Sequence, residues 1–362
     1  MKITVDQVEL VAALSKAQSA VSSKNTITLL NNVYLKAEGE TLTVSATDLE
    51  LTITAQVSAT IEEAGTTTLP AKKLLSIVRQ LPHAPVTLET DENQVSSISC
   101  LQSFFKIAGL SDLEYPVEGE IEDYRELTLN NVQFKKMMEK ISYSVSNDET
   151  RHSLNGILLS IREGTFTTVA TDGRRLALVE SFLDLDASLD GDVILPIKAV
   201  NELQKLLSNE GEVLIKLGEA RAEFTIADTT LRSKLIDGSF PNFRQVIPQN
   251  FTQQIEIPRV ALSDALHRVT LVLSDASGAV KMNMTQSEVV VSAKSDTDES
   301  SEPVSVDFIG DATDISLNPI FISEPLRKLD CDNITIRFND RISPIGIFGD
   351  EGFLYIIMPM RS

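Results

Sequence analysis

The sequence repeats itself at a spacing of about 124 residues, and this repeat limits the folds that the chain can adopt. Residues 166–178 form two apolar, strand-like runs around Asp172 and Gly173, a pair that is typical of hairpin turns. Residues 42–51 have the same pattern, and residues 289–296 carry a fainter third copy. Three copies predict three related domains in one chain. Their expected bounds are 1–120, 121–249 and 250–362.

Each copy contains the same order of predicted elements. A helix comes first, followed by about four strands, a second helix and about four more strands, which indicates an α+β domain with antiparallel sheets. The second helix of each copy begins beside a proline, at Pro70, Pro196 and Pro319, because a helix tolerates proline in its first turn. The predicted helices are 6–21, 69–82, 132–145, 195–207, 258–269 and 318–329. The predicted strands are 29–36, 40–57, 86–88, 95–100, 104–108, 154–161, 166–178, 213–217, 222–227, 230–236, 281–284, 288–293, 334–338, 345–348 and 353–358.

Apolar residues recur at helical spacing in the first predicted helix, and they define the face that we expect to be buried. These residues are Val8, Val11, Leu14, Ala17 and Val21. Asp6 precedes them and is predicted to cap the helix, because its carboxylate can accept hydrogen bonds from the free N–H groups of the first turn.

Composition is that of a folded protein that does not span a membrane, since no run of about 18 apolar residues occurs. The first residues alternate apolar and polar, so no signal peptide is expected and the predicted location is the cytoplasm. Cys100 and Cys331 are far apart and are predicted to be reduced thiols. His83, His152 and His267 lack metal-ligand spacing, so we expect neither a metal nor another cofactor.

The net charge of −20, averaged over the molecule, argues against a nucleic-acid partner. The cations are unevenly distributed, however, and the predicted helices hold many of them. If equivalent helices faced a common axis, their cations would form one positive surface that contacts phosphates without reading bases. For any single helix, an ordinary solvated face explains the same residues. The helix cations are Lys16, Lys72, Lys73, Arg79, Lys135, Lys136, Lys140, Lys198, Lys205, Arg259, Arg268, Arg327 and Lys328.

The sequence contains no recognisable catalytic constellation. Asp48 and Asp172 occupy equivalent places in two copies, so we expect them to brace the same turn rather than to act as general acids or bases. Neither a Gly-x-Ser-x-Gly elbow nor a glycine-rich phosphate loop is present. A scaffold is therefore favoured. A nuclease or phosphatase built on carboxylates, or a ring-shaped scaffold unrelated to DNA, are the alternatives.

Three motifs, in order along the chain, resemble one family. They are residues 170–177 (ATDGRRLA), 233–243 (SKLIDGSFPNF) and 355–361 (YIIMPMR), and residues 152–156 and 1–5 also fit. On these residues the whole chain resembles the bacterial sliding clamp, the beta subunit of DNA polymerase III. The resemblance implies three domains per chain and a head-to-tail homodimer, closed as a ring around duplex DNA with helices lining the hole. It implies a processivity factor rather than an enzyme, which tethers the replicative polymerase, the clamp loader and repair proteins.

The resemblance also implies a hydrophobic pocket, between the second and third domains, that binds short peptides of these partners. Apolar walls would hold an aliphatic or aromatic anchor, while arginines and exposed backbone at the rim would fix an extended peptide. Two departures from the family pattern affect its edge: Gln245 stands where many relatives carry a basic residue, and the segment 274–279 is one residue short and lacks an aromatic and a basic residue. The implied pocket residues are Leu154, Thr171, Gly173, Arg174, Arg175, Leu176, Pro241, Val246, Asn318, Phe321, Ile342, Pro344, Ile356, Met358, Pro359, Met360 and Arg361.

Two further sets of residues are predicted to make contacts in the assembly. Lys24 and Lys72 match family positions that approach DNA. With the helix cations, the predicted DNA-facing residues are Lys24, Lys72, Lys73, Arg79, Lys136, Lys198 and Lys205. The residues that match the interface between the first and third domains of two subunits are Phe105, Ile107, Val272 and Leu273.

Overall fold

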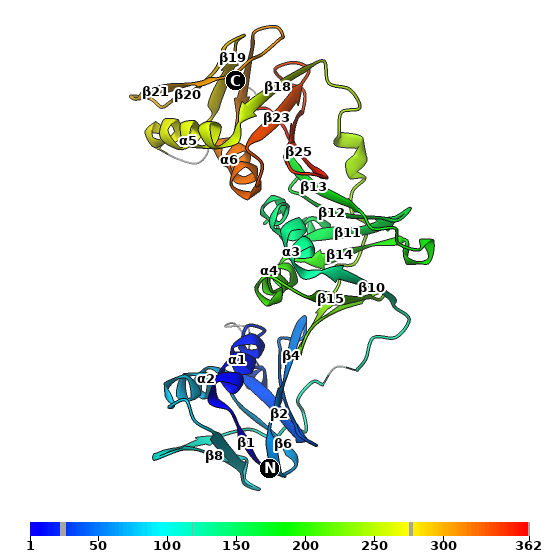
Figure 1. Ribbon diagram of the computed structural model, residues 1–362, viewed down its shortest axis with the longest axis vertical. Coiled ribbons are helices and arrows are strands. Elements are labelled where there is room, and N and C mark those ends of the chain that lie inside the picture. Colours follow the sequence, from blue (N-terminus) through cyan, green and yellow to red (C-terminus); the bar gives the residue numbers. More distant parts are fainter. Residues whose placement is uncertain (22–26, 118, 275–277, 361–362) are drawn as a thin grey trace. The chain divides into compact units, whose positions relative to one another are not determined.

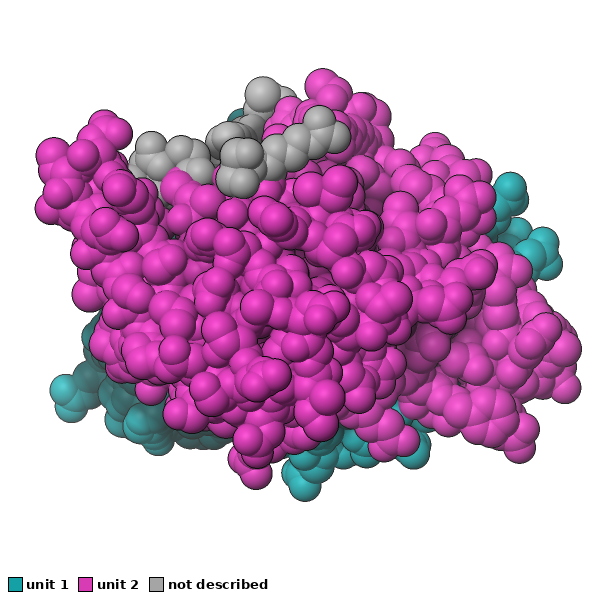
Figure 2. All heavy atoms as spheres, turned by 90° about the horizontal axis from the view of Figure 1, so that it is seen from above, with its two compact units in different colours: residues 1–134, 198–235 teal, residues 135–197, 236–362 magenta. Residues whose placement is uncertain are grey.

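The computed structural model describes residues 1–21, 27–117, 119–274 and 278–360. Its backbone contacts divide the chain into two compact units, coloured separately in Figure 2. Unit 1 comprises residues 1–134 and 198–235, and unit 2 comprises residues 135–197 and 236–362. The boundary between the units therefore runs through the second predicted domain, which contributes one sheet to each unit.

Six α-helices occur in the described part of the chain, and they match the six predicted helices (Figure 1). They are α1 (Gln7–Gln18), α2 (Ala71–Gln80), α3 (Asn131–Glu139), α4 (Ile197–Leu206), α5 (Arg259–Val269) and α6 (Pro319–Lys328). As predicted, α2 and α4 start directly after Pro70 and Pro196, and Pro319 lies in the first turn of α6. α3 is shorter than predicted: Ile141 and Val145 lie beyond its end, although both side chains are buried.

The first helix has the predicted cap, but its buried face agrees with the prediction only in part. The Asp6 carboxylate accepts hydrogen bonds from the backbone N–H groups of Val8 and Glu9, at 2.8 and 3.2 Å. Val8, however, is 54% exposed. The residues that are buried are Gln7, Leu10, Ala13, Leu14 and Ala17. Leu14 and Ala17 are therefore buried as predicted, but Leu10 and Ala13 complete the buried stripe in place of Val8.

Twelve or more short strands in each unit form the antiparallel sheets. In unit 1 they are β1 (Lys2–Val5), β2 (Asn32–Glu38), β3 (Thr41–Thr47), β4 (Leu51–Ser58), β5 (Thr60–Glu63), β6 (Gly65–Pro70), β7 (Val86–Thr90), β8 (Val95–Cys100), β9 (Ser103–Ala108), β10 (Arg125–Asn130), β15 (Glu212–Leu217), β16 (Arg221–Ile226) and β17 (Thr229–Lys234). In unit 2 they are β11 (Gly156–Arg162), β12 (Thr165–Thr171), β13 (Arg175–Phe182), β14 (Gly191–Pro196), β18 (Gln253–Pro258), β19 (Val280–Met284), β20 (Glu288–Lys294), β21 (Glu299–Ser305), β22 (Thr313–Leu317), β23 (Asn333–Phe338), β24 (Ile345–Phe348) and β25 (Phe353–Ile357).

A strand leads directly into every described α-helix, and the sequence prediction omitted these strands. They are β1, β6, β10, β14, β18 and β22. Each is only four to six residues long, and its apolar residues merge with those of the following helix, so a change of period from two to 3.6 is hard to detect. The prediction was also wrong at residues 29–31, which belong to a 3₁₀ turn (Thr28–Asn31) before β2.

The sheet topology repeats three times. One half of each repeat is a four-stranded sheet: β6-β2-β3-β4, β14-β11-β12-β13 and β22-β19-β20-β21. The other half follows the second helix and runs β1-β7-β8-β9, β10-β15-β16-β17 and β18-β23-β24-β25, with β5 added beside β1. In unit 1, β4 pairs with β17, and in unit 2, β13 pairs with β25, so two halves of successive repeats fuse into an eight-stranded sheet. The predicted threefold α+β architecture is confirmed.

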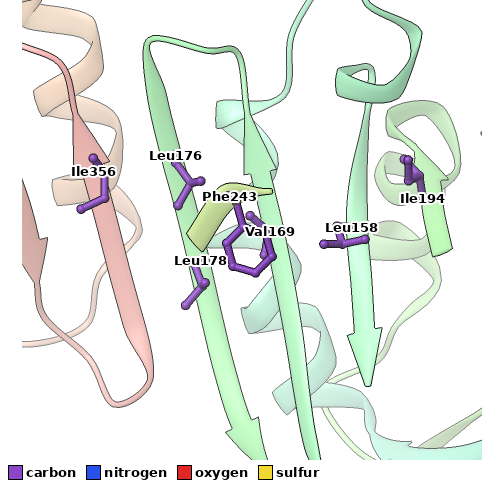
Figure 3. Packing of buried hydrophobic residues seen from close by; sticks show 7 residues of the cluster. All are labelled: Leu158, Val169, Leu176, Leu178, Ile194, Phe243 and Ile356. Carbon is purple, nitrogen blue, oxygen red and sulfur yellow. The ribbon is translucent and has the colours of Figure 1, made fainter. Parts of the chain in front are cut away.

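In unit 2, a cluster of buried side chains crosses one of these joints (Figure 3). Leu176 and Ile356 face each other from β13 and β25, and Val169 lies beside them on β12. Phe243 lies in a short 3₁₀ turn (Phe243–Val246) between β17 and β18 and is only 7% exposed. The connection between these two strands is therefore packed onto the sheet at Phe243. None of the described helices is long and apolar enough to cross a membrane.

Candidate functional site

The turn between β12 and β13 is held by side chains from its own strands. The Asp172 Oδ1 atom accepts hydrogen bonds from the backbone N–H groups of Arg174 and Arg175, at 2.9 and 3.1 Å. The Thr171 hydroxyl donates to the Arg175 carbonyl at 2.5 Å and accepts from the Gly173 N–H at 3.1 Å. Asp172 thus braces the turn, as predicted.

The first copy of the repeat has the same turn. Asp48 Oδ1 accepts from the N–H groups of Glu50 and Leu51, and the Leu49 N–H donates to the Thr47 hydroxyl. Leu49 has φ +76° where Gly173 has φ +85°, so both turns need one residue in the left-handed region. The shared hydrogen bonds confirm that the aspartate belongs to the architecture, and that differences between the copies lie in the other side chains.

The largest difference is at Arg175, whose counterpart in the first copy is the buried Leu51. The Arg175 side chain is only 8% exposed. Its Nε donates to Asp172 Oδ2 at 3.0 Å, one terminal nitrogen donates to Glu324 on α6, and the other donates to the Tyr143 carbonyl at 2.6 Å. The guanidinium also lies 4.3 Å from the centre of the Phe321 ring.

These contacts correct the prediction for Arg175. We expected the arginines of this motif to fix a peptide at the rim, but the donors of Arg175 are used inside the molecule. A planar guanidinium with five fixed donors suits this role, because it can bind two carboxylates and a carbonyl at once. Arg175 therefore ties β13 to α6, while the neighbouring Arg174 remains exposed.

The end of the described chain is anchored on both sides. The Met358 N–H donates to the Arg174 carbonyl at 3.0 Å, and the Met360 N–H donates to the Ser316 carbonyl on β22 at 2.8 Å. The Tyr355 hydroxyl donates to the Phe321 carbonyl at 2.8 Å, which fixes the first turn of α6. Residues 358–360 are thus held between the Asp172 turn and an edge strand.

A groove of about 800 Å³ opens beside this segment. Four residues of the implied pocket line it: Ile342, Met358, Pro359 and Met360. Ile342 is 73% exposed and Met358 is 44% exposed, so apolar surface is available to a ligand. Five polar residues that the sequence reasoning missed also line the groove: Lys281, Asp314, Ser316, Asp340 and Arg341. They lie outside every motif that the sequence singled out, and only the folding of β19, β22 and the β23–β24 loop brings them together.

The other implied pocket residues fall into two groups. Leu154, Thr171, Leu176 and Ile356 are buried, so their side chains offer little open surface. The remaining described residues are exposed or half-buried: Gly173, Arg174, Pro241, Val246, Asn318, Phe321 and Pro344. Asn318 has a clear local role, because its side chain caps α6 by accepting from the N–H groups of Ile320 and Phe321.

Some positions of the site lie outside the described residues. Arg361 is one of them, and so are residues 275–277 of the shortened segment. Gln245, the other departure from the family pattern, is exposed.

Many of the predicted DNA-facing cations are paired with carboxylates. Lys136 lies 2.8 Å from Asp330, and Lys205 lies 2.7 Å from Glu202. Lys198 is paired with Asp48. By contrast, Lys72 and Lys73 are exposed on α2 and form no ion pair within the described chain.

Arg79 and Lys24 are the last two residues predicted to face DNA. Arg79 is also exposed and donates only to the Ser15 hydroxyl, at 3.0 Å. Lys24 lies outside the described residues. Among the described residues of the predicted set, the cations without a carboxylate partner are therefore Lys72, Lys73 and Arg79, all on α2.

The predicted subunit-interface residues are unequally accessible. Phe105 on β9 is 39% exposed, and Val272 and Leu273 are half-buried. Ile107 is only 5% exposed, so its side chain packs inside its own unit. Two exposed apolar residues beside this set were missed: Phe104 at 60% and Leu271 at 73%.

In the described part of the chain, no group of three histidine, cysteine, aspartate or glutamate side chains is placed to hold a metal ion. Cys100 and Cys331 are both free. Burial, followed by the charge of Asp350, raises the pKa of the Cys331 thiol, so that side chain is a poor nucleophile at neutral pH.

Edge-to-edge joints between repeated α+β domains define a fold of the DNA-clamp type. Three family models match in order: the N-terminal domain of the DNA polymerase III beta subunit at residues 1–118, the central domain at 128–242 and the C-terminal domain at 244–361. The chain therefore belongs to the DNA polymerase III beta subunit family, and the resemblance drawn from the motifs is confirmed.

Individual relatives agree along the full length. The chain is 30% identical to the beta sliding clamp of Chlamydia muridarum, over all of this chain and 99% of that protein. The solved sliding clamp of Bacillus subtilis is 26% identical with a TM-score of 0.97, over all of this chain and 99% of that one. The sliding clamp of Bartonella birtlesii, solved bound to griselimycin, is 30% identical with a TM-score of 0.95, over the whole of both chains.

Proposed function

We propose that two copies of this chain close into a ring around duplex DNA and slide along it as a processivity factor. The repeated joint between sheets is the observation that carries the proposal. In both joints the third residues of the two strands lie opposite each other: Ile53 of β4 with Leu231 of β17, and Ala177 of β13 with Tyr355 of β25. The same connection is thus made twice with the same register.

Each joint pairs the last strand of one four-stranded half with the last strand of another half, and two such strands, β9 and β21, remain outside any joint within the described chain. β9 holds the place of β17 and β25 in its repeat, and β21 holds the place of β4 and β13. Both are sheet edges without a partner strand within the described chain. A third joint, between two copies, would place Phe105 of one chain opposite Ser301 of the other. Such a head-to-tail contact either closes a ring or continues as a filament, and the family resemblance favours closure with two copies.

The exposure of Phe105 supports this joint. Leu231 and Tyr355, its counterparts in the existing joints, are 0% exposed, whereas Phe105 is 39% exposed in the single chain. Covering the rest of a phenylalanine and the neighbouring Phe104 would stabilise the contact by about 1–3 kcal/mol through the hydrophobic effect. A paired edge would also satisfy backbone groups that a free edge exposes.

A closed ring needs only weak contacts with DNA. With Lys72, Lys73 and Arg79 as the accessible cations of the predicted set, phosphate binding would be modest and screened by salt. Retention would come from confinement instead, because a ring cannot leave a duplex sideways. Weak contacts without base readout are also what sliding requires.

The groove beside Met358 supports a second role, the tethering of other proteins. Its exposed Ile342 and Met358 fit an apolar anchor, and methionine adapts to ligands of different shape. We propose that short extended peptides of the replicative polymerase, the clamp loader and repair proteins bind there. Tethering would raise the effective concentration of polymerase at the primer end. On this proposal the chain is a non-catalytic, cytoplasmic subunit of the polymerase assembly, and nothing supports the alternative of a carboxylate-based nuclease or phosphatase.

The mass of the assembly tests the ring. At micromolar concentration we expect about twice the chain mass of 39.7 kDa. Phe105→Asp should give monomers, because a carboxylate would be buried in the joint. Phe182→Asp is the matched control, since Phe182 is 71% exposed at the far end of β13 and should leave the mass unchanged. A wild-type chain that is strictly monomeric under these conditions would contradict the ring.

Confinement is tested on DNA. Protein loaded on a nicked circle should be retained, and should fall off when a restriction enzyme linearises the circle. Retention on the linear product would show ordinary affinity for DNA instead of topological linkage.

A further inference from the structure

The first helix of each repeat has a cation at the same position. Counted from the start of α1, α3 and α5, the tenth residue is Lys16, Lys140 and Arg268, respectively. Lys16 and Arg268 lie in the last turn of their helices, and Lys140 directly follows α3. The three side chains are therefore equivalent, and their partners can be compared.

In both joints inside the chain, this cation pairs with a carboxylate at the tip of a hairpin. At the joint of β4 and β17, Lys16 Nζ lies 2.9 Å from Asp228 Oδ1, in the tip between β16 and β17. Lys16 also donates to the Thr229 hydroxyl at 2.9 Å. At the joint of β13 and β25, Lys140 Nζ lies 2.5 Å from Asp350 Oδ2, in the tip between β24 and β25. Each pair thus connects the helix of one repeat to the joint strand of the next.

Backbone hydrogen bonds show that these tips belong to the joints. The Gln56 N–H of β4 donates to the Asp228 carbonyl at 2.9 Å, and the Glu180 N–H of β13 donates to the Gly352 carbonyl at 3.0 Å. Gln56 and Glu180 are both the sixth residues of their strands, so the ion pairs close the same end of the two joints. The Asp228 side chain is 50% exposed and that of Asp350 is 13% exposed, so water weakens the first pair more than the second.

The third repeat uses its cation differently. Arg268 binds Glu302 of β21 with two hydrogen bonds, one from Nε at 2.8 Å and one from a terminal nitrogen, and the bond from Arg268 lowers the pKa of the Glu302 carboxyl. Glu302 is the fourth residue of its strand, and the fourth residues of β4 and β13 are the uncharged Thr54 and Leu178. A planar guanidinium held by both carboxylate oxygens is well fixed, so Arg268 is kept on the edge strand of its own repeat.

The hairpin tip that would face Arg268 also lacks a carboxylate. In the joint proposed between two copies, β9 takes the place of β17 and β25, so the tip is the one between β8 and β9. This tip consists of Leu101 and Gln102, and both are exposed. Gln102 directly precedes β9 as Asp228 directly precedes β17. The joint between copies therefore has an amide in place of the carboxylate, and a cation that is already occupied.

We propose that the ion pair of helix cation and tip carboxylate is a latch that keeps a sheet joint closed, and that Glu302 and Gln102 together withhold this latch from the joint between copies. The latches inside the chain are the pairs of Lys16 with Asp228 and of Lys140 with Asp350. The statement about two copies rests on the proposed ring, whereas the latches inside the chain do not depend on it.

Subunit exchange tests the joint between copies. Two populations of the full chain carry donor and acceptor dyes, and energy transfer appears as they exchange subunits, which requires this joint to open. Gln102→Asp combined with Glu302→Thr supplies the tip carboxylate and releases Arg268, with the threonine that β4 has at Thr54. We expect exchange about two- to tenfold slower than in wild type, because each of the two joints of the ring gains one partly exposed ion pair.

Further variants assign the slowing to the latch. Adding Arg268→Ala to the double variant should abolish it, and raising the salt concentration should reduce it. Gln102→Asp alone should have a smaller effect, because Glu302 still holds Arg268. Gln102→Lys combined with Glu302→Thr is the matched control at the same positions, and it should exchange faster than wild type because like charges then face each other.

Hydrogen exchange tests a latch inside the chain. Lys16→Met removes the charge and keeps an unbranched side chain, so the Gln56 amide at the end of the joint should exchange about two- to fivefold faster. Lys36→Met is the matched control, since it breaks an exposed ion pair with Glu38 on β2, two strands away from the joint, and should leave the Gln56 amide unchanged.

The possible failures are distinguishable. If the double variant exchanges subunits as fast as wild type, or if its slowing survives Arg268→Ala, the latch proposal is overturned while the ring stands. An unchanged Gln56 amide in Lys16→Met overturns it as well. A wild-type chain that never forms dimers contradicts the proposed ring and, with it, the statement about the joint between copies, and hydrogen exchange then decides the latch inside the chain.

Discussion

The replacement of Arg175 by leucine separates the function of this side chain from that of the turn around it. The first repeat provides the rationale, because Leu51 occupies the same place beside an identically hydrogen-bonded turn. A leucine at 175 should therefore leave the turn intact. It would remove the contacts with Asp172, Glu324, the Tyr143 carbonyl and the Phe321 ring.

The expected loss of stability follows from burial. Breaking a fully buried ion pair costs about 3–5 kcal/mol, because an unpaired charge remains. Here the stranded Glu324 side chain is 30% exposed and Asp172 is 18% exposed, so water can solvate both in part. Leucine would also keep some apolar contact with Phe321. We therefore expect Arg175→Leu to lower the free energy of unfolding of unit 2 by about 2–3 kcal/mol.

Urea unfolding and peptide binding measure the two consequences. Arg174→Leu is the matched control for stability, since Arg174 is exposed on the same turn and its replacement should cost less than about 0.5 kcal/mol. In a double-mutant cycle with Glu324→Leu, the coupling energy should be about 1–3 kcal/mol. Peptide affinity should fall in Arg175→Leu, because α6 and Phe321 lose their tie to β13. Equal stabilities for the two arginine variants, with a coupling energy near zero, would refute the assignment of Arg175 as an internal tie.

Three further predictions concern stability and DNA. In unit 2, burial acts to raise the pKa of Asp350. Hydrogen bonds from Lys140 and from the Asp330 and Cys331 N–H groups outweigh burial, so the pKa is lowered overall. A carboxyl with a lowered pKa stabilises the fold at pH values above the ordinary aspartate pKa, and this stabilisation is lost as the pH falls through the pKa of the folded state. Asp350→Asn should therefore lower the free energy of unfolding by about 3 kcal/mol at pH 7 and by progressively less below about pH 4. Urea titrations measure the difference, and a difference that does not change with pH would contradict this. Gly352→Ala should cost about 2–4 kcal/mol, because its Cβ would lie 2.0 Å from the Glu180 carbonyl oxygen at φ +72°, whereas Gly39→Ala, at φ +63° with open space around it, should cost only about 1 kcal/mol. Lys72→Ala with Lys73→Ala should weaken salt-dependent binding to short linear DNA and lower the slope against log salt by about two, while retention on circles stays unchanged.

The sequence was sufficient for the repeated architecture because each repeat carries its own local signals. Pro70, Pro196 and Pro319 mark the second helix of each copy, and the Asp-containing turn marks the central hairpin. The strands before the helices escaped detection, since period alone cannot separate four strand residues from the helix that follows them. The buried face of α1 was predicted correctly at Leu14 and Ala17 but not at Val8, because only packing against neighbouring elements selects Leu10 over Val8.

The lining of the proposed docking groove was also only partly predictable from the sequence. Met358 lies in a motif and Ile342 was implied by the family resemblance, but neither signal included Lys281, Asp314 and Arg341, which reach the groove from three different elements. The sequence also could not predict which cations are free to bind a partner. Lys136 and Lys198 are cations on helices, yet Asp330 and Asp48, both distant along the chain, neutralise them. Whether a cation is available to a partner is decided by tertiary contacts, which no pattern of spacing records.

Comparison of the repeats indicates where function was added to a common frame. The aspartate of the turn is kept at Asp48 and Asp172 with the same backbone hydrogen bonds, so it serves the fold in both places. Asp48 has a second oxygen left over and pairs with Lys198, whereas Asp172 uses its second oxygen to hold Arg175. The same carboxylate thus supports different neighbours. In unit 2 that neighbour connects the turn to α6 and leaves Arg174 and Met358 exposed beside the groove. Because the first repeat has Leu51 in place of Arg175, it lacks this arginine-mediated connection between the turn and a helix.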